Sequence, residues 1–182
     1  MKIPLSRRKK ALFIVDVQAA FLNERNKGVV KNISKLLEKV KYDLYVEAIF
    51  HAEKSSLWDK QIKWTLPKTD KFSTVAALRE LLKDKKRVYV DKTTRSVFKG
   101  DKDIFKILQA NKIKEVHIVG VQTNSCVLTT ALEAFDANFF TYVIEECCES
   151  DELGKHQLGV EILREQNLTN NSCVEDIGFL TI

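Results

Sequence analysis

The chain has few of the residues that mark linkers and loop-rich folds: its 182 residues include only 6 glycines and 2 prolines. It has no CxxC pair among its four cysteines and is too large to need disulfide staples, which favours a reduced compartment. Basic residues precede the apolar run at 11–15, but Asp16 interrupts that run, leaving it too short for a secretory signal or a membrane span. We therefore expect a cytoplasmic protein with no membrane partner.

Length and composition are those of an ordinary globular protein. With 45% hydrophobic and 30% charged residues, the chain is expected to form one domain over residues 1–182. The net charge of +5 comes from 30 basic and 25 acidic residues that are scattered along the chain. The short basic clusters at 7–10 and 83–87 are better interpreted as solvated ends of secondary-structure elements, so no nucleic-acid partner is expected.

Apolar patterns of two kinds alternate along the chain. Runs typical of buried strands occupy residues 11–17, 44–50, 87–90, 116–119 and 139–144, and helical stripes occupy 33–40, 75–82, 104–108, 124–137 and 151–166. Residues 51–70 are irregular and predict a loop or short helical turns, while residues 173–182 can add a last strand. This alternation predicts an α/β protein whose parallel sheet carries helices on both faces.

Three reactive side chains follow strands of the predicted sheet. Asp16 ends the first strand, Lys92 follows the third, and Cys126 follows the strand at 116–119. Ligands of parallel sheets bind beyond the carboxyl ends of the strands, so these side chains are expected to converge. Three candidate N-cap residues, 123–125, place Cys126 in the first turn of a helix, where free N–H groups and the macrodipole favour a thiolate. For this stretch alone, a cysteine buried for packing stays an open alternative.

Together the three groups form a coherent nucleophilic set. Partial burial would raise the pKa of Asp16 and suit it to take a proton, and Lys92 would hold Asp16 and lower the pKa of the thiol. Cys126 would attack a carbonyl carbon, Asp16 would return the proton to the departing amine, and water would clear the acyl-enzyme. Taken singly, Asp16 can equally be a turn residue and Lys92 a surface lysine.

Three motifs, in order along the chain, resemble those of the isochorismatase-like cysteine hydrolases. Residues 14–18 with Phe21 are similar to the D-x-Q…F opening of that family, and residues 92–98 to its K-x-x-x-S-x-F segment. Residues 120–127 match its G-V-x-T-x-x-C-V signature. Residues 130–136 and 151–156 continue the likeness, which covers nearly the whole chain.

The resemblance implies a three-layer α/β/α hydrolase with a six-stranded, mainly parallel sheet, assembled as a dimer or tetramer. It implies a catalytic triad of Asp16, Lys92 and Cys126, and a cis peptide bond between Val121 and Gln122. That bond would aim the Gln122 N–H, together with the Cys126 N–H, into an oxyanion hole. Phe21, Gln122 and Trp64 would line the pocket. The function expected is hydrolysis of a small molecule, most plausibly of an amide C–N bond through a thioester.

One departure from the family pattern bears on metals. Nicotinamidases of the family carry a D-x-H…H set after the second strand, whereas residues 50–58 here contain one histidine and no such spacing. No metal and no cofactor are therefore expected. Two alternatives stay open, a nicotinamidase and a binding or structural protein that keeps the fold without turnover. Retention of Cys126 favours thioester chemistry over vinyl-ether cleavage, which relatives can perform without a cysteine.

The roles of several other residues are left open by the sequence. His51, Trp58 and Arg95 could each touch the substrate or only pack and pair locally. His156 lies on an apolar helical stripe and is interpreted as a packed, hydrogen-bonded histidine. Cys147 and Cys148 are expected to follow a strand and to be ordinary buried thiols.

Overall fold

The computed structural model describes residues 8–68 and 73–169 and contains a sheet of five strands. The strands are β1 (Lys10–Val15), β2 (Leu44–Phe50), β3 (Arg87–Lys92), β4 (Glu115–Val121) and β5 (Phe140–Glu149). Every pairing is parallel, in the order β3-β2-β1-β4-β5. The predicted α/β class and parallel sheet are confirmed. The described residues give five strands rather than the six implied by the resemblance, and the last strand expected at 173–182 lies outside the described residues.

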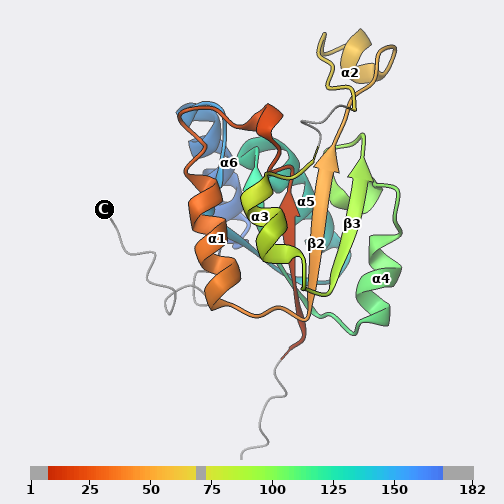
Figure 1. Ribbon diagram of the computed structural model, residues 1–182, viewed down its shortest axis with the longest axis vertical. Helices are drawn as coiled ribbons and strands as arrows, with labels where there is room; N and C mark the ends of the chain where they lie inside the picture. The colour runs from red at the N-terminus through yellow and green to blue at the C-terminus, as the bar shows by residue number, and fades with distance from the viewer. Residues whose placement is uncertain (1–7, 69–72, 170–182) are drawn as a thin grey trace, which may run out of the picture.

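Helices cover both faces of the sheet, which makes the three layers visible in Figure 1. One apolar core joins the sheet to α1 (Val29–Lys39) and α3 (Ala76–Leu82), and a second joins it to α4 (Ile104–Ala110), α5 (Leu128–Asp136) and α6 (Leu153–Glu165). Alternate residues of β1 enter opposite cores: Ala11, Phe13 and Val15 enter one, Leu12 and Ile14 the other. In the part of the chain that the structure describes, no helix is long and apolar enough to cross a membrane.

The second strand, β2, carries an acidic residue in its middle but is buried throughout. Glu47 is only 2% exposed, and its carboxylate accepts a hydrogen bond from Arg87 of β3 at 3.1 Å. This cross-strand ion pair satisfies the buried carboxylate, and it explains how a glutamate is tolerated inside the sheet.

The fifth strand is longer than its apolar run predicts. It was expected to end at residue 144, but β5 continues to Glu149 beyond a register shift opposite Ile118 and Gly120 of β4. Cys147 and Cys148 therefore lie inside the strand, not after it, although both are buried free thiols as expected. A bulge adds residues to one strand without ending the pairing, which the apolar pattern alone does not reveal.

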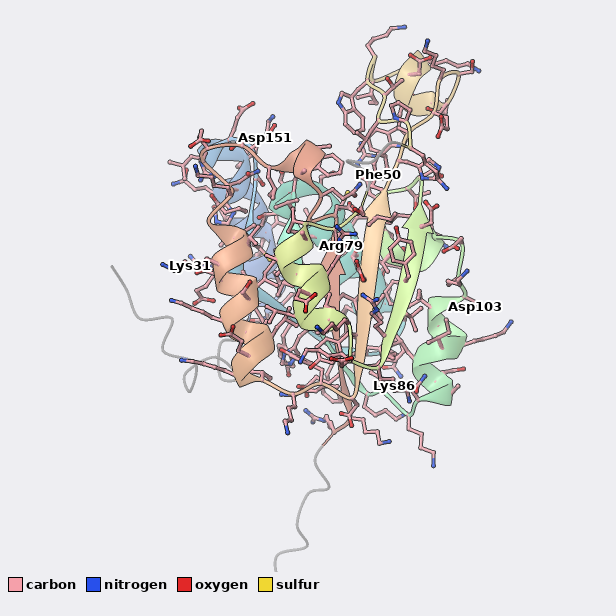
Figure 2. The ribbon with its side chains drawn as sticks, viewed as in Figure 1. Lys31, Phe50, Arg79, Lys86, Asp103 and Asp151 are labelled. Atoms are coloured by element: carbon pink, nitrogen blue, oxygen red, sulfur yellow. The ribbon has the colours of Figure 1, made fainter. Side chains whose placement is uncertain are left out.

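The carboxyl ends of the strands face the segment that projects furthest from the sheet (Figure 1). This segment, residues 51–68, contains the short helix α2 (Leu57–Lys60), in agreement with the predicted loop with short helical turns. Figure 2 shows Phe50 and Asp151 at this end of the molecule and Lys86 at the opposite end. Two 3₁₀ turns, η1 (Ala19–Phe21) and η3 (Val97–Lys99), follow β1 and β3 at the same edge.

Candidate active site

A buried ion pair joins the ends of β1 and β3. The Lys92 Nζ atom donates to Oδ2 of Asp16 at 2.7 Å and to the carbonyl oxygen of Thr94 at 3.0 Å. Both side chains of the ion pair are at most 1% exposed. The second carboxylate oxygen, Oδ1, is buried and has no hydrogen-bond partner among the described residues. Because Oδ1 is removed from water and accepts no such bond, it can accept a proton from a neighbouring group.

The backbone at Asp16 turns sharply out of the sheet. Asp16 has a positive φ of 54°, which is unfavourable for a residue other than glycine, and its N–H bonds the Ala48 carbonyl at 3.0 Å. Two residues on, the buried amide of Gln18 bonds both backbone groups of Phe50, donating at 3.0 Å and accepting at 2.7 Å. The Gln of the opening motif therefore ties the Asp16 turn to the end of β2.

Cys126 lies in the turn that follows β4. Gly120 begins this turn with a φ of 127°, and a Cβ there would lie 2.1 Å from the Val15 carbonyl oxygen, so only glycine fits beside β1. The peptide bond between Val121 and Gln122 is cis. Thr123–Val127 then form a π-helical turn that leads into α5, where the sequence predicted one α-helix over 124–137.

The electrostatics of the cysteine differ from the prediction. Burial, reinforced by the Asp16 carboxylate, raises the pKa of Cys126 to about 12 even though the Lys92 ammonium opposes the shift. Lys92 lowers the pKa of the thiol as the sequence predicted, but burial and the Asp16 carboxylate outweigh this effect, so the expectation that a thiolate is favoured is wrong. Burial also raises the pKa of Asp16, against the lowering effect of Lys92, as the sequence predicted. Burial thus disfavours the charged form of both groups, and the Lys92 ammonium favours it.

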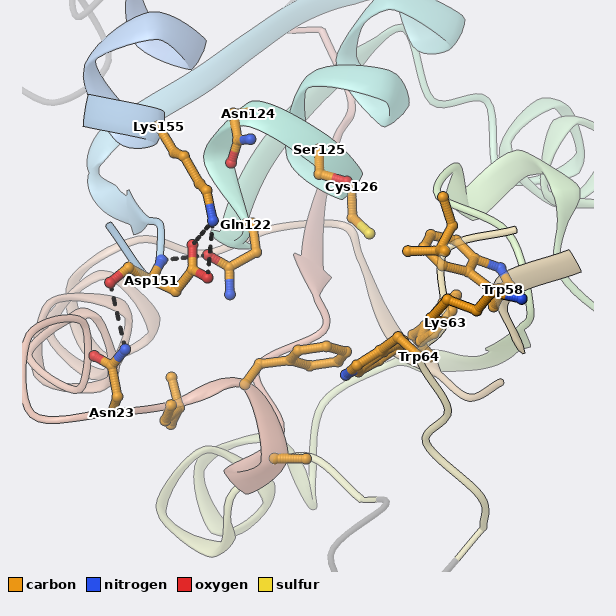
Figure 3. A pocket seen from close by; sticks show the side chains of 15 residues that line it. Asn23, Trp58, Lys63, Trp64, Gln122, Asn124, Ser125, Cys126, Asp151 and Lys155 are labelled. Atoms are coloured by element: carbon orange, nitrogen blue, oxygen red, sulfur yellow. Dashed lines mark hydrogen bonds and ion pairs between the residues drawn. The ribbon is translucent and has the colours of Figure 1, made fainter. Parts of the chain in front are cut away.

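The Cys126 side chain opens into a cavity of about 660 Å³ (Figure 3). The three predicted substrate-binding residues, Phe21, Gln122 and Trp64, all line it. The Trp64 ring lies 5.8 Å from the rings of both Phe21 and Phe50, and Trp58 completes this aromatic wall. A cavity of this size with one apolar wall is typical of a small-molecule site.

The opposite wall of the cavity is polar and was not predicted. Gln122 accepts a hydrogen bond from the backbone N–H of Asp151 at 2.5 Å, and the Asp151 carboxylate pairs with Lys155 of α6 at 3.3 Å. Figure 3 shows this chain of contacts beside Asn124 and Cys126. Gln122 and Asp151 are 29 residues apart, so the only available sequence signal for their contact was the family likeness of residues 151–156.

The residues left open by the sequence lie outside or at the rim of this cavity. Of the three, Trp58 alone lines it; its indole N–H donates to the Thr93 carbonyl at 2.8 Å, and Arg95 stacks over its ring at 4.6 Å. His51 is absent from the lining and pairs with Asp91 at 2.7 Å. Local pairing is therefore the arrangement found for His51 and Arg95.

The side chains present do not fit a bound metal of the nicotinamidase kind. The described residues contain no group of three His, Cys, Asp or Glu side chains that could hold a metal ion. His51, the histidine after β2, faces Asp91 and is joined there by Lys68, whose ammonium pairs with the same carboxylate. The Asp91 carboxylate is therefore already paired with two basic side chains.

Comparison with known proteins assigns the chain to a family. The family model for the isochorismatase domain matches residues 10–174. The chain is also 33% identical over 144 residues to the uncharacterized isochorismatase family protein YrdC of Bacillus subtilis, covering 76% of this chain and 72% of that protein. The fold is a three-layer α/β/α domain with a parallel sheet, and the chain belongs to the isochorismatase family.

Solved structures agree with this assignment at the level of the fold. A pyrazinamidase of Pyrococcus horikoshii in complex with zinc has a TM-score of 0.75 at 21% identity, with 88% of this chain and 97% of that chain covered. A pyrazinamidase/nicotinamidase from Streptococcus mutans has a TM-score of 0.74 at 24% identity, with 88% and 99% covered. The isochorismatase-like architecture predicted from the motifs is confirmed, and a hydrolase fold is shown.

Proposed function

We propose that the protein is a cysteine-dependent hydrolase that cleaves an amide C–N bond in a small molecule through a thioester. The observation that carries this proposal is that Cys126 lines the cavity while the buried Asp16–Lys92 ion pair lies close enough to shift the pKa of its thiol. A buried ion pair is expensive to retain without a use, because apolar residues of similar volume are often as stable. A buried ion pair that acts on a neighbouring thiol therefore supports a catalytic role for the three residues.

In the first half of the reaction, Asp16 acts as the general base. Its Oδ1 takes the proton of the Cys126 thiol while sulfur bonds to the amide carbon and the carbonyl oxygen becomes an oxyanion. The raised pKa of the thiol requires this coupling, because little thiolate exists before the substrate binds. Collapse of the oxyanion breaks the C–N bond, and Asp16 returns the proton to the leaving nitrogen.

The second half repeats these steps with water. Asp16 takes a proton from water, the resulting hydroxide attacks the thioester carbon, and the C–S bond breaks to release a carboxylic acid and regenerate the thiol. Lys92 keeps its bond to Oδ2 throughout and so holds the carboxylate towards sulfur. The N–H groups of Gln122 and Cys126 are the proposed donors to the oxyanion, since both belong to the turn that carries the nucleophile.

The cavity favours a flat acyl group. Phe21, Phe50 and Trp64 would contact one face of it, and Gln122 would present its amide N–H₂ from the polar wall, because its oxygen is already bonded to Asp151. Pyrazinamidases and nicotinamidases among the structural neighbours make an aromatic amide a specific candidate. The absence of a three-ligand metal cluster from the described residues argues for hydrolysis that does not depend on a metal.

The proposal is tested by ammonia release from nicotinamide, pyrazinamide and benzamide, with Cys126→Ser beside wild type. Cys147→Ser is the matched control, because Cys147 is also a buried free thiol but is not among the residues that line the cavity. We expect ammonia from at least one amide, its loss in Cys126→Ser, its retention in Cys147→Ser, and no change after dialysis against EDTA. Acid quench during turnover should trap an acyl adduct on the peptide containing Cys126.

Three outcomes would count against the proposal in different ways. Turnover that survives Cys126→Ser would exclude the thioester route. Turnover lost with EDTA and restored by zinc would favour the nicotinamidase alternative. Neither ammonia nor an adduct from any of the amides would favour the alternative of a binding or structural protein that keeps the fold without turnover.

A further inference from the structure

A histidine outside the cavity contacts the turn that carries the nucleophile. His156 lies on α6 with its side chain 19% exposed, and its Nδ1 atom is 2.9 Å from the hydroxyl oxygen of Thr123. It is not among the residues that line the cavity. Thr123 is fully buried and begins the π-helical turn. It follows Gln122 directly and precedes Cys126 by three residues.

The helix α6 meets the same turn at a second point, one helical turn further on. Gly159 lies three residues after His156 and therefore on the same face of α6. A Cβ at Gly159 would be 2.7 Å from the Asn124 nitrogen and 2.8 Å from its Cα atom. The backbone of α6 is thus pressed against the backbone of the turn, and the hydrogen bond to Thr123 sets where along the helix this contact occurs.

The same ring nitrogen also faces a carboxylate that belongs to a network of polar contacts. The Nδ1 atom of His156 is 3.1 Å from Oε1 of Glu149, and Glu149 pairs with Arg25. Arg25 donates to the Ser150 carbonyl at 3.0 Å, and the Ser150 hydroxyl donates to the side-chain oxygen of Asn124 at 3.0 Å. The chain of contacts that starts at His156 therefore returns to the residue after Thr123.

We infer that His156 is a positioning residue for hydrolysis: through Thr123 it fixes the backbone of residues 122–124, and with it the N–H groups that would receive the oxyanion. This inference rests on the proposed function for its catalytic meaning. Its structural content, that the turn is held in place from α6, can be tested without a substrate. An oxyanion donor must be oriented before the reaction, and removing one such donor reduces kcat about 10²–10³-fold, so loosening the turn should lower kcat.

The neutral form of His156 is the one that this arrangement favours. Burial is the largest cause and lowers its pKa; of the charges that face it, Glu149 and Glu145 on β5 raise the pKa, whereas Arg25 and Arg164 lower it. Nδ1 lies within hydrogen-bond distance of both the Thr123 hydroxyl and the Glu149 carboxylate, so a proton on Nδ1 can be donated to either oxygen. An asparagine places an amide group near the position of Nδ1 and can make the same bond.

The test compares His156→Leu, which removes the bond, with His156→Asn, which can restore it. Amide hydrogen exchange of the full chain is followed by mass spectrometry in peptides covering residues 122–128, relative to a peptide from β1 that reports global unfolding. We expect exchange in residues 122–128 to be at least ten-fold faster in His156→Leu and within about three-fold of wild type in His156→Asn. His117→Leu is the matched control, since buried His117 bonds Tyr42 and Glu115 instead.

Kinetics on the best amide then test the catalytic meaning. We expect kcat to fall at least ten-fold in His156→Leu with KM within two-fold of wild type, and to recover in His156→Asn. Unchanged exchange in His156→Leu, or equal acceleration in His117→Leu, would overturn the inference whether or not the protein hydrolyses amides. Absence of turnover in wild type would instead remove the proposed function and leave the exchange result to decide the positioning role.

Discussion

Replacing Asp16 with asparagine should make Cys126 more reactive towards an alkylating agent while it abolishes hydrolysis. In the structure, burial and the Asp16 carboxylate raise the pKa of the thiol to about 12, against the lowering effects of the Lys92 ammonium and of a hydrogen bond with Ser125. Asparagine removes the negative charge and keeps the ammonium, so the pKa of the thiol should fall. The same change removes the proposed proton acceptor. Alkylation and turnover therefore move in opposite directions.

The size of the effect follows from the fraction of thiolate. A pKa of about 12 leaves roughly one thiol in ten thousand ionised at pH 8, whereas an ordinary cysteine with a pKa of about 8.5 is about one quarter ionised. A decrease of one pKa unit in Asp16→Asn already predicts a rate of carbamidomethylation about ten-fold higher at pH 8. Loss of a general base should reduce kcat by roughly 10²–10⁴-fold.

The assay measures the second-order rate of iodoacetamide addition between pH 6 and 10, quantified on the peptide that contains Cys126. The alkylation rate of the wild-type protein should rise across this pH range without reaching a plateau. The carboxylate raises the pKa of the thiol more than the ammonium lowers it. The pKa of the thiol should therefore be lowest in Asp16→Asn, higher in the double variant Asp16→Asn with Lys92→Met, higher again in wild type, and highest in Lys92→Met. The double variant removes both charges, so no buried charge is left unpaired. It therefore serves as a control for single variants that fail to fold because they leave an unpaired buried charge.

A wild-type plateau below pH 9, or slower alkylation in Asp16→Asn, would refute the reasoning. Either result would mean that the resting cysteine is a thiolate stabilised by Lys92 and that Asp16 assists it, which is the arrangement expected from the sequence alone. Alkylation that is insensitive to both residues would show that sulfur is not coupled to the ion pair.

Three further expectations follow from the structure. Gly120→Ala should lower the free energy of unfolding by more than about 2 kcal/mol in urea titrations. The control Gly154→Ala, where an added Cβ meets nothing within 4 Å, should change it by less than about 1 kcal/mol, and equal losses would contradict the close contact of Gly120 with β1. Trp64→Ala should raise KM about ten-fold with kcat nearly unchanged, and a change confined to kcat would contradict its place in the aromatic wall. Because burial lowers the pKa of His156 below 6.5, the unfolded chain binds the proton more tightly, so stability should decrease as pH falls from about 6.5; His156→Asn should reduce this slope, and an identical slope would contradict it.

The sequence predicted the features that depend on the spacing of apolar residues and on the position of residues at strand ends. Five strands were located because buried parallel strands give continuous apolar runs, and each was found within a few residues of its expected place apart from the far end of β5. The meeting of Asp16 and Lys92 followed from the rule that the ends of parallel strands share one edge of the sheet. The choice of Phe21, Gln122 and Trp64 as lining residues followed from the family resemblance.

The parts that were missed depend on contacts between distant residues. The polar wall joins Gln122 to Asp151 and Lys155, and no local pattern predicts that the Asp151 N–H meets the Gln122 amide. The extension of β5 follows from a bulge, which leaves no periodic signal in the apolar residues. His51 was placed correctly at a strand end, but its pairing with Asp91 follows from the register of β2 with β3.

The state of Cys126 shows how a local rule yields to its surroundings. A first-turn position offers a thiolate partial charges from backbone N–H groups, an effect of about 0.3–1 kcal/mol at an exposed site. Folding places the thiol at 8% exposure beside a carboxylate, and desolvation with one neighbouring negative charge shifts a pKa by several units, each worth about 1.4 kcal/mol. Desolvation and the carboxylate outweigh the helix terminus, so the cysteine rests as a thiol. Asp16 then has a task that a helix terminus cannot perform, which is to remove the proton at the moment sulfur attacks.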